Sequence, residues 1–223
     1  MNLVEAVKAR KSIRAYKPDP VPKQILREIL EIATRAPSAD NSQPWEITII
    51  TGKILKDIAK ANVAALKSGR PAAPDVTRVP YEGIYRKRQI EVGKQLFGLM
   101  EIPRDDKEKR NEWMERGFRF FDAPVAFLLA ADEVLDPTRA ASDIGGIAQT
   151  ICLVAQEYGL GTCITSQGVA YADIVKHYTK IPKTKKLYWS ISLGYPDWDF
   201  PANKVKTDRE PLEINTTWLG FDE

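Results

Sequence analysis

The chain has 223 residues, of which 43% are hydrophobic, so it can bury a sizeable core and is not expected to be disordered. Its formal net charge is only +3, and this balance argues against a protein that mainly binds a nucleic-acid backbone. The single histidine, His177, leaves almost nothing for a histidine-based triad or metal site. We therefore expect no metal, and a borrowed cofactor as the reactive group.

The sequence also bears on where the protein works. The opening residues MNLVEAVKARK lack the apolar stretch and cleavage site of a secretory signal, and no run approaches ~18 apolar residues. The spacing of Cys152 and Cys163 matches no metal or redox motif, so we expect two reduced, buried thiols. These features predict a cytoplasmic protein that does not associate with membranes.

Before residue 70 the pattern predicts three helices and one strand. Apolar residues recur at helical spacing in the helices, and Asn2 is a plausible N-cap for the first of them. A loop rich in small polar residues, PSADNSQP, follows the second helix and precedes an alternating strand. The predicted ranges are helices over 2–10, 22–36 and 52–69 and a strand over 45–51.

The stretch RKSIRAY after the first helix concentrates positive charge. Arg10 continues the apolar stripe of that helix, so we do not expect it on the solvent-exposed face. If residues 10–14 are extended, Arg10, Ser12 and Arg14 point to one side and Lys11 to the other. Two guanidinium groups and a hydroxyl would then converge in a way that suits a phosphate. A solvated, charged helix end is the alternative at this point.

Residues 70–120 differ in character from the segments around them. They are rich in proline and charge and contain a predicted helix at roughly 88–100. We interpret them as an excursion from a single domain formed by residues 1–223, where they act as a lid, although a solvated helical hairpin fits the pattern equally well. The side chains expected to select the substrate there are Tyr81, Tyr85, Arg86 and Trp113.

The core pattern resumes after this excursion. A helix follows a buried strand and is apolar around most of its circumference, so it must be central or lie at a subunit interface. The tail has too many Pro and Asp residues for regular structure, but its Trp, Phe and Leu residues predict that it packs against something. The interleaved order predicts a mixed sheet between helical layers. The predicted ranges are strands over 123–131 and 186–194, a helix over 142–161 and a short helix around His177.

Two common nucleotide-binding motifs are absent. The stretch GLGTCI has Ile164 where the dinucleotide fingerprint requires glycine, and it follows a helix instead of opening one. No Walker motif, G-x-x-x-x-G-K-[ST], occurs. A Rossmann dehydrogenase and a P-loop nucleotidase are therefore disfavoured, and a distributed anion site formed by the 10–14 segment, the PSADN turn and Arg209 is favoured.

Five blocks in order resemble the nitroreductase family of FMN-dependent oxidoreductases. They are RKSIRAY (10–16), APSADNSQPW (36–45), GLGTC (159–163), LGYPD (193–197) and REPLEI (209–214). Each block is weak by itself, but their order and spacing span most of the chain. The resemblance implies an α+β fold with a mixed, mostly antiparallel sheet flanked by helices. It also implies an intertwined homodimer with a flavin at each subunit interface.

The resemblance further implies which residues bind FMN. The R-x-S-x-R segment would contact the phosphate, the ribityl chain and the N1/C2 edge of the ring. The loop after residue 36 would reach the flavin of the other subunit, and residues 165–168 would run along the N5/O4 side. The implied set is Arg10, Lys11, Ser12, Arg14, Pro37, Ser38, Ala39, Asn41, Thr165, Ser166, Gln167, Gly168 and Arg209.

Two positions depart from the family pattern. Many members have a second basic residue two positions before the C-terminal arginine, where this chain has Thr207, and Lys206 is the candidate substitute. Many members also have proline where Ile164 stands, so the ring-side loop is expected to differ in shape.

The implied chemistry is a ping-pong cycle in which NADH or NADPH gives a hydride to the flavin and leaves. A nitroaromatic, a quinone or a similar planar acceptor then takes the same place. No catalytic side chain is needed, and Arg14 is the candidate that stabilises the reduced flavin electrostatically. A reductive dehalogenase or a flavin-remodelling enzyme would share the flavin motifs and differ in the lid. A non-catalytic module that binds anions or nucleic acid is the remaining alternative.

Overall fold

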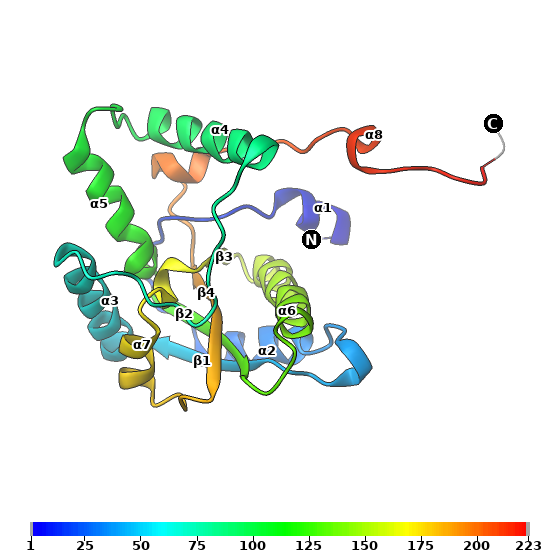
Figure 1. Cartoon of the computed structure of the whole chain (residues 1–223), viewed down its shortest axis with the longest axis horizontal. Helices are drawn as coiled ribbons and strands as arrows, with labels where there is room; N and C mark the ends of the chain where they lie inside the picture. The colour runs from blue at the N-terminus through cyan, green and yellow to red at the C-terminus, as the bar shows by residue number, and fades with distance from the viewer. Residues whose placement is uncertain (1, 222–223) are drawn as a thin grey trace.

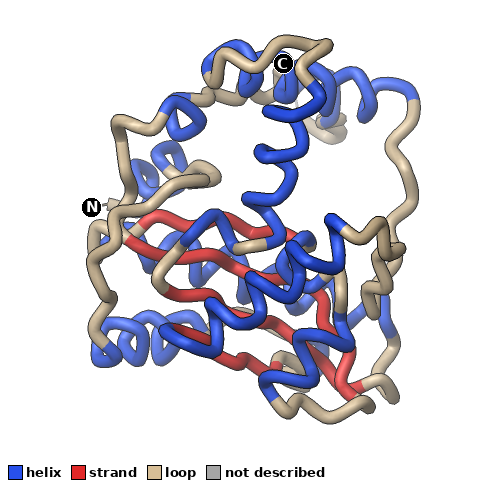
Figure 2. The backbone as a smooth tube through the Cα atoms, turned by 90° about the vertical axis from the view of Figure 1, so that its left-hand side faces the viewer, coloured by secondary structure: helices blue, strands red, loops and turns tan. Residues whose placement is uncertain are grey.

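The computed structural model describes residues 2–221, and a four-stranded sheet with the order β1-β2-β4-β3 lies at its centre (Figures 1 and 2). Neighbouring strands all pair antiparallel. Parallel pairing among the described residues is confined to isolated bridges, including one between Ser12 and Thr162. Strands β1 and β3 therefore form the two edges of the sheet. The strands are β1 (Glu46–Thr51), β2 (Val125–Asp132), β3 (Gly161–Thr165) and β4 (Lys185–Gly194).

Helices cover both faces of the sheet, as the α+β expectation requires (Figure 2). Helices α2 and α6 pack on one face, and α3 and α7 pack on the other. Helices α4 and α5 rise above the sheet, and α1 lies beneath α4 in the view of Figure 1. The helices are α1 (Leu3–Ala9), α2 (Lys23–Ala33), α3 (Gly52–Lys67), α4 (Gly83–Leu99), α5 (Lys107–Phe118), α6 (Pro137–Glu157), α7 (Ala172–Thr179) and α8 (Leu212–Asn215).

Strand β2 is apolar along its length because its two faces belong to different cores. Phe127 and Leu129 pack with α2 and α6, whereas Leu128 and Ala130 pack with α3 and α7. Successive side chains of a strand point to opposite faces, so both faces of this central strand need apolar residues. Full burial of one such large side chain contributes about 1.5–3 kcal/mol. This explains why the run APVAFLLAA does not alternate with polar residues.

The structure moves two predicted boundaries and adds one strand. The helix expected over 142–161 begins at Pro137, because the Asp136 carboxylate caps it by accepting from the Arg139 N–H at 2.8 Å. It ends at Glu157, and the unpredicted strand β3 follows. The helix expected at roughly 88–100 begins at Gly83.

Helix α6 packs against α2, the sheet and α1, but part of its surface is less well covered within the described chain. Ile144, Ile147 and Ile151 are fully buried in the core beneath α2. Leu153 and Val154, on another side of the helix, are only half-buried. The described part of the chain therefore leaves some of the apolar surface of this helix without a complete cover.

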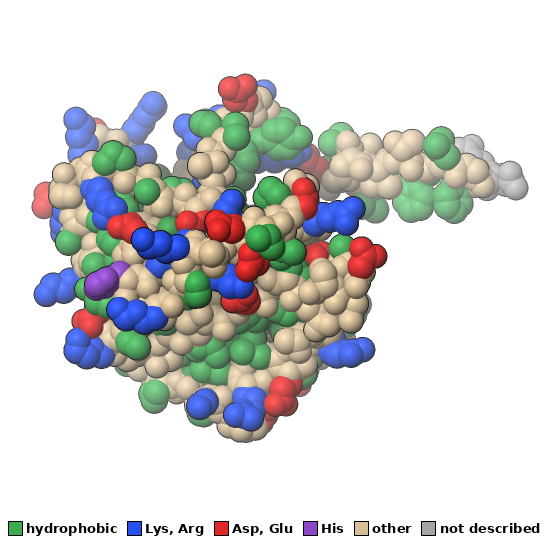
Figure 3. Space-filling view, turned by 60° about the horizontal axis from the view of Figure 1, so that its bottom comes forward, with side chains coloured by type: hydrophobic (Ala, Val, Ile, Leu, Met, Phe, Trp, Pro, Cys, Tyr) green, Lys and Arg blue, Asp and Glu red, His purple; other side chains and the backbone are tan. Residues whose placement is uncertain are grey.

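The C-terminal tail behaves in two different ways. Ala202, Asn203 and Val205 are buried against the body, which agrees with the expectation that the tail packs. Beyond them the chain leaves the body, and hydrophobic side chains line the projecting segment in Figure 3. For this part the expectation is wrong within one chain. The exposed apolar residues there are Leu212, Ile214, Trp218, Leu219 and Phe221. None of the helices in residues 2–221 is both long enough and apolar enough to cross a membrane.

Candidate functional site

A groove of ≈ 940 Å³ opens beside α1, and basic side chains from both ends of the sequence line it. Five of the lining residues are cationic at neutral pH and belong to positions 8, 10, 11, 206 and 209, with no carboxylate among the lining residues. Such a concentration of positive charge suits an anion with several oxygens, such as a phosphate. The lining residues are Val7, Lys8, Ala9, Arg10, Lys11, Gln149, Ile164, Val205, Lys206, Thr207 and Arg209.

Local structure places Arg10 at the mouth of this groove. A capping box opens α1, in which Asn2 Oδ1 accepts from the Glu5 N–H at 2.9 Å and the Glu5 carboxylate accepts from the Asn2 N–H at 3.2 Å. The helix closes at Arg10, and the chain then becomes extended. The Ile13 N–H donates to the carbonyl of Thr162 in β3 at 2.9 Å, and the Ile13 side chain is 2% exposed. The segment is thus anchored to the sheet on one side while its charges face outward.

The prediction that Lys11 points away from Arg10 is wrong, because both residues line the groove. Arg10 has φ −56° and ψ 123°, and such backbone does not keep the strict alternation of a pleated strand. Partial burial lowers the pKa of Lys11, and the charges of Lys206 and Arg14 lower it further. The Arg14 guanidinium therefore belongs to the same cluster of positive charge.

Ser12 has a different environment from the residue on either side of it. It forms the isolated parallel bridge with Thr162 and is absent from the groove lining. Burial raises the pKa of the Cys163 thiol, while the charge of Arg14 and a hydrogen bond with Ser12 act in the opposite direction. Ser12 is therefore engaged with β3, and the structure does not bring its side chain to the groove with Arg10. Both cysteines are free and buried, as expected.

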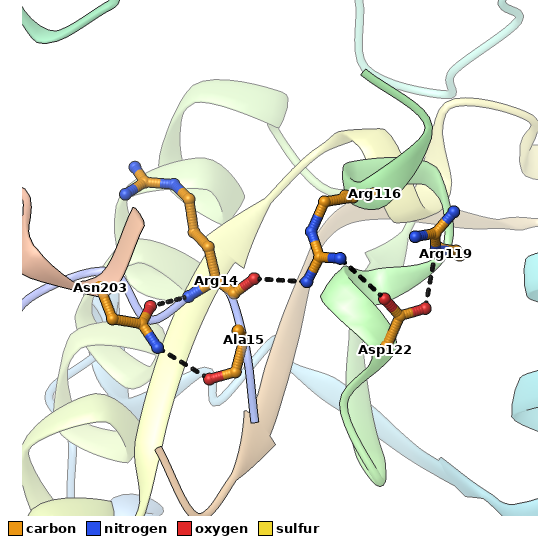
Figure 4. Close-up of polar contacts among 6 residues, drawn as sticks. All are labelled: Arg14, Ala15, Arg116, Arg119, Asp122 and Asn203. Carbon is orange, nitrogen blue, oxygen red and sulfur yellow. Dashed lines mark hydrogen bonds and ion pairs between the residues drawn. The ribbon is translucent and has the colours of Figure 1, made fainter. Parts of the chain in front are cut away.

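Two side chains from distant segments hold the backbone of Arg14 (Figure 4). The Arg14 N–H donates to Asn203 Oδ1 at 2.7 Å, and its carbonyl accepts from Arg116 Nη2 at 3.1 Å. Asn203 Nδ2 also donates to the Ala15 carbonyl at 2.9 Å. The Arg14 side chain points away from both contacts in Figure 4. Neither Asn203 nor Arg116 was among the predicted site residues.

The segment that carries Lys206 and Arg209 is held by helix α4. The Lys206 N–H donates to Gln95 Oε1 at 3.1 Å, and Arg88 pairs with Glu210 at 2.9 Å. Arg209 Nη1 donates to the carbonyls of Thr207 and Asp208, so its guanidinium is folded back on its own segment. The Lys206 side chain supplies a cation next to the position where the family pattern loses one at Thr207.

Residues 164–168, the segment that the family resemblance places beside the flavin ring, lie partly in the groove and partly in the interior. Ile164 lines the groove and is 38% exposed, an unusual position for a large apolar side chain. Thr165 is buried, and its Oγ1 accepts from the Gln167 N–H at 3.1 Å. Gly168 is packed so tightly that an added Cβ would lie 2.3 Å from the Phe120 ring. The sequence marked Ile164 as a departure from the glycine of the dinucleotide fingerprint and from the proline of the family pattern, but its exposure in the groove appears only in the structure.

The loop with Pro37, Ser38, Ala39 and Asn41 does not reach the groove in this chain. It sits at the first half of α6, where the Asp143 carboxylate accepts from the Ala39 N–H at 3.3 Å. Asn41 lies in the left-handed region with φ 56°. The structure therefore separates these four residues from Arg10 and Lys11 within a single chain.

The predicted lid residues fall into two places. Tyr81 and Tyr85 are exposed near the start of α4, and Arg86 donates to Gln89 one turn further along that helix. Trp113 lies on α5, half-buried, with its ring 6.4 Å from that of Phe121. The structure thus groups Tyr81, Tyr85 and Arg86 around the start of α4 and separates Trp113 from them on α5, where it lines a different groove.

Comparison with known proteins identifies the relatives of this chain. Residues 7–195 match the model of the Nitroreductase family. The chain is 60% identical to a Thermus thermophilus protein named NADH dehydrogenase, over 91% of each sequence. It is 30% identical to 4-nitrobenzoate reductase of Pseudomonas putida, over 97% of this chain and 95% of that one.

A solved structure agrees with these relatives. The FMN and NADPH-dependent nitroreductase NfnB of Sphigopyxis sp. strain HMH superimposes with a TM-score of 0.95 at 30% identity. The match covers 99% of this chain and 100% of that one. The four-stranded sheet, its helical layers and the order of the sequence blocks therefore have one explanation: the chain belongs to the nitroreductase family.

Proposed function

We propose that this protein is an FMN-dependent oxidoreductase that uses NADH or NADPH to reduce a nitroaromatic, a quinone or a similar planar electrophile. The names of its relatives support this activity, since they include 4-nitrobenzoate reductase and an FMN and NADPH-dependent nitroreductase. The relatives' names differ over the hydride donor, because the Thermus thermophilus protein is named NADH dehydrogenase. Both nicotinamide donors therefore belong in the test.

One observation carries the proposal, namely the convergence of Arg10, Lys11, Lys206 and Arg209 on one groove. Partial burial is the largest cause of the lowered pKa of Lys11, and the neighbouring charges of Lys206 and Arg14 are the next. These cations therefore repel one another when no anion is bound. A phosphate monoester would relieve this repulsion and accept charge-assisted hydrogen bonds. The groove volume of ≈ 940 Å³ is of the size that holds small molecules and cofactors, about 300–1,000 Å³. The residues present thus fit the phosphate end of FMN.

The side chains of this protein would bind FMN and stabilise its reduced form, and none of them would act as an acid or a base. When bound, FMN would supply the hydride acceptance and donation. Arg14 would hold a fixed positive charge that favours negative charge on a reduced ring, and Ile164 would offer an apolar surface beside it. His177 is exposed on α7, where its ring packs edge-on against Tyr178 at 5.1 Å, on the far face of the sheet from α6.

Two copies of the chain would form the working unit. Helix α1 exposes Leu3, Val4 and Val7, and the projecting tail exposes further apolar residues that residues 2–221 leave uncovered. Large exposed apolar side chains gathered on one element are typical of a protein interface. The loop at 37–41 is separated from the groove within one chain, which supports its predicted contact with the flavin of the other subunit.

The excursion at 70–120 would be the lid of a single domain formed by residues 1–223. Its helices α4 and α5 stand above the sheet in Figure 1, and both touch segments that carry groove residues. The exposed aromatic side chains near the start of α4, Tyr81 and Tyr85, would meet a planar acceptor.

Purified protein tests the proposal directly. We expect a yellow preparation that releases FMN on denaturation, bleaches under anaerobic conditions on addition of NADH or NADPH, and regains colour on addition of a nitroaromatic or a quinone. A colourless protein that takes up no added FMN would overturn the flavin assignment. A yellow protein that neither donor bleaches would overturn the reductase activity and leave a flavin-binding relative of different chemistry.

A further inference from the structure

We propose that Arg116, on helix α5 of the excursion, is a positioning residue for Arg14, which it holds through the backbone in partnership with Asn203. The inference rests on the proposed function, because it concerns the orientation of the cation assigned to the reduced flavin. It also gives the excursion a role in the electrostatics of the cofactor site in addition to covering it.

The peptide groups on both sides of Arg14 are held by side chains from elsewhere in the chain. Asn203 accepts from the Arg14 N–H at 2.7 Å and donates to the Ala15 carbonyl at 2.9 Å. Arg116 donates to the Arg14 carbonyl at 3.1 Å. With the backbone fixed on two sides, the direction in which the Arg14 side chain leaves the segment is also fixed (Figure 4).

The Arg116 guanidinium is itself held on three sides. Its Nη1 pairs with Asp122 at 3.3 Å, its Nη2 donates to the Arg14 carbonyl, and its Cζ lies over the Phe200 ring, 4.6 Å from the ring centre. Phe200 and Asn203 belong to the same turn, since the Asn203 N–H donates to the Phe200 carbonyl at 3.0 Å. The two side chains that hold Arg14 are therefore supported by a common element.

The burial of the Arg116 guanidinium is not explained by a gain in folding stability. The Arg116 side chain is only 17% exposed, and its Nε is buried without a hydrogen-bond partner among the described residues. A buried donor left unpaired costs about 1–3 kcal/mol, and a buried ion pair is often no more stabilising than apolar residues of the same volume. A specific geometric task explains why the guanidinium is placed here.

A left-handed turn aims the partner carboxylate at Arg116. Phe120, Phe121 and Asp122 have φ of 59°, 54° and 59°, a conformation that is costly for residues other than glycine. The turn brings Asp122 back toward α5, where it pairs with both Arg116 and Arg119. Arg119 pairs with the same carboxylate, and its side chain makes no hydrogen bond to Arg14 in the described part of the chain, so it offers a matched control.

The test is a double-mutant cycle on the FMN-loaded protein, read out by the two-electron midpoint potential of bound FMN. We expect Arg116→Met to lower the preference for reduced over oxidised FMN about tenfold, which corresponds to a potential lower by about 30 mV. Arg119→Met should leave the potential unchanged. Arg116→Lys keeps the charge and a hydrogen-bond donor, so its FMN potential should stay close to that of the wild type. In an Arg14→Gln background, Arg116→Met should add nothing further, because the residue acts through Arg14.

Amide hydrogen exchange of the FMN-free protein gives a second measurement that does not depend on the flavin. Exchange at the Arg14 amide should quicken in Arg116→Met and remain at the wild-type rate in Arg119→Met. The inference is overturned if Arg116→Met keeps the wild-type potential and exchange rate, or if its effect on the potential persists undiminished without Arg14. Wild-type protein that takes up no FMN would instead overturn the proposed function, and amide exchange would then decide whether Arg116 holds Arg14.

Discussion

Lys11 and Lys206 come from opposite ends of the chain, yet they lie close enough for the charge of Lys206 to lower the pKa of Lys11, in addition to the larger effect of partial burial. The two ammonium groups repel each other, and an anion bound between or beside them would offset this repulsion. Their arrangement supports the prediction that Lys206 substitutes for the basic residue that many family members carry at the position of Thr207.

We expect Lys206→Ala to raise the dissociation constant of FMN about tenfold or more, because a charge-assisted hydrogen bond to phosphate contributes about 1.5–3 kcal/mol. Fluorescence titration of FMN into stripped protein measures the change. Lys204→Ala is the control, since Lys204 is exposed in the same segment and does not line the groove. Equal losses in both variants would mean that only overall charge matters.

The projecting tail should be required for assembly. Removal of the residues after Pro211 takes away apolar side chains that the single chain leaves exposed, among them Leu212, Ile214 and Trp218. We expect the shortened protein to shift from dimer toward monomer in analytical ultracentrifugation. Val134→Ser removes an equally exposed apolar side chain from a loop of the body and should leave the dimer intact. A wild-type monomer would contradict the proposed assembly.

The start of α4 should influence which acceptor is reduced. Tyr85 is 63% exposed, so its removal should disturb little of the fold. We expect Tyr85→Ala to change the ratio of kcat/KM for a nitroaromatic to that for a quinone several-fold, because a planar acceptor loses an aromatic contact. Tyr178→Ala on α7 serves as the control. An unchanged ratio in a Tyr81→Ala, Tyr85→Ala double variant would remove the lid from acceptor selection.

Gly168 should tolerate no side chain. A Cβ there would lie 2.3 Å from the Phe120 ring and 2.5 Å from Ser190 Oγ, and Phe120 is fully buried and cannot move aside. We expect Gly168→Ala to lower the free energy of unfolding by about 1–3 kcal/mol in chemical denaturation. Gly98→Ala in α4 meets nothing within 4 Å and should stabilise slightly, by about 0.5–1 kcal/mol.

Stability should fall at alkaline pH, partly through Cys152. Burial raises the pKa of this thiol from 9.0 to about 11, with Thr162 and Arg10 acting in the opposite direction. Between these values the thiol ionises in the unfolded chain and stays protonated in the folded one, so rising pH favours unfolding. We expect the stability difference between wild type and Cys152→Ser to narrow above pH 9, by up to about 1.4 kcal/mol per pH unit. A constant difference between pH 8 and 10.5 would show that the thiol is not linked to folding.

Local sequence rules account for much of the fold. Asn2 as N-cap, the apolar stripe of 22–36 and the alternation of 45–51 each correspond to an element close to its predicted bounds. Strand β3 escaped prediction because GTCIT is short and begins with glycine, and its conformation depends on pairing with β4. Whether the 142–161 helix lies at a subunit interface stays a prediction.

The candidate site also contains some residues that the sequence could identify and others that it could not. Arg10, Lys11 and Arg209 are in recognisable blocks, and the structure brings them together in the groove. Arg116 gave no signal, because a lone arginine in the charged stretch KEKRNEWMERG is indistinguishable from a solvated one. Its contact with Arg14 spans 102 positions and depends on the packing of α5, which no local pattern encodes. The same holds for Asn203.

The attachment of residues 12 and 13 to the outer strand of the sheet has a consequence for solubility. Strand β3 lies at the edge, and its backbone groups are partly covered by the Ile13 N–H and the Ser12–Thr162 bridge. An uncovered edge strand is a template for pairing with other chains and hence for aggregation. The charged segment therefore protects the edge of the sheet from intermolecular pairing, in addition to its proposed role in binding an anion. We expect loss of its order to reduce both cofactor retention and solubility.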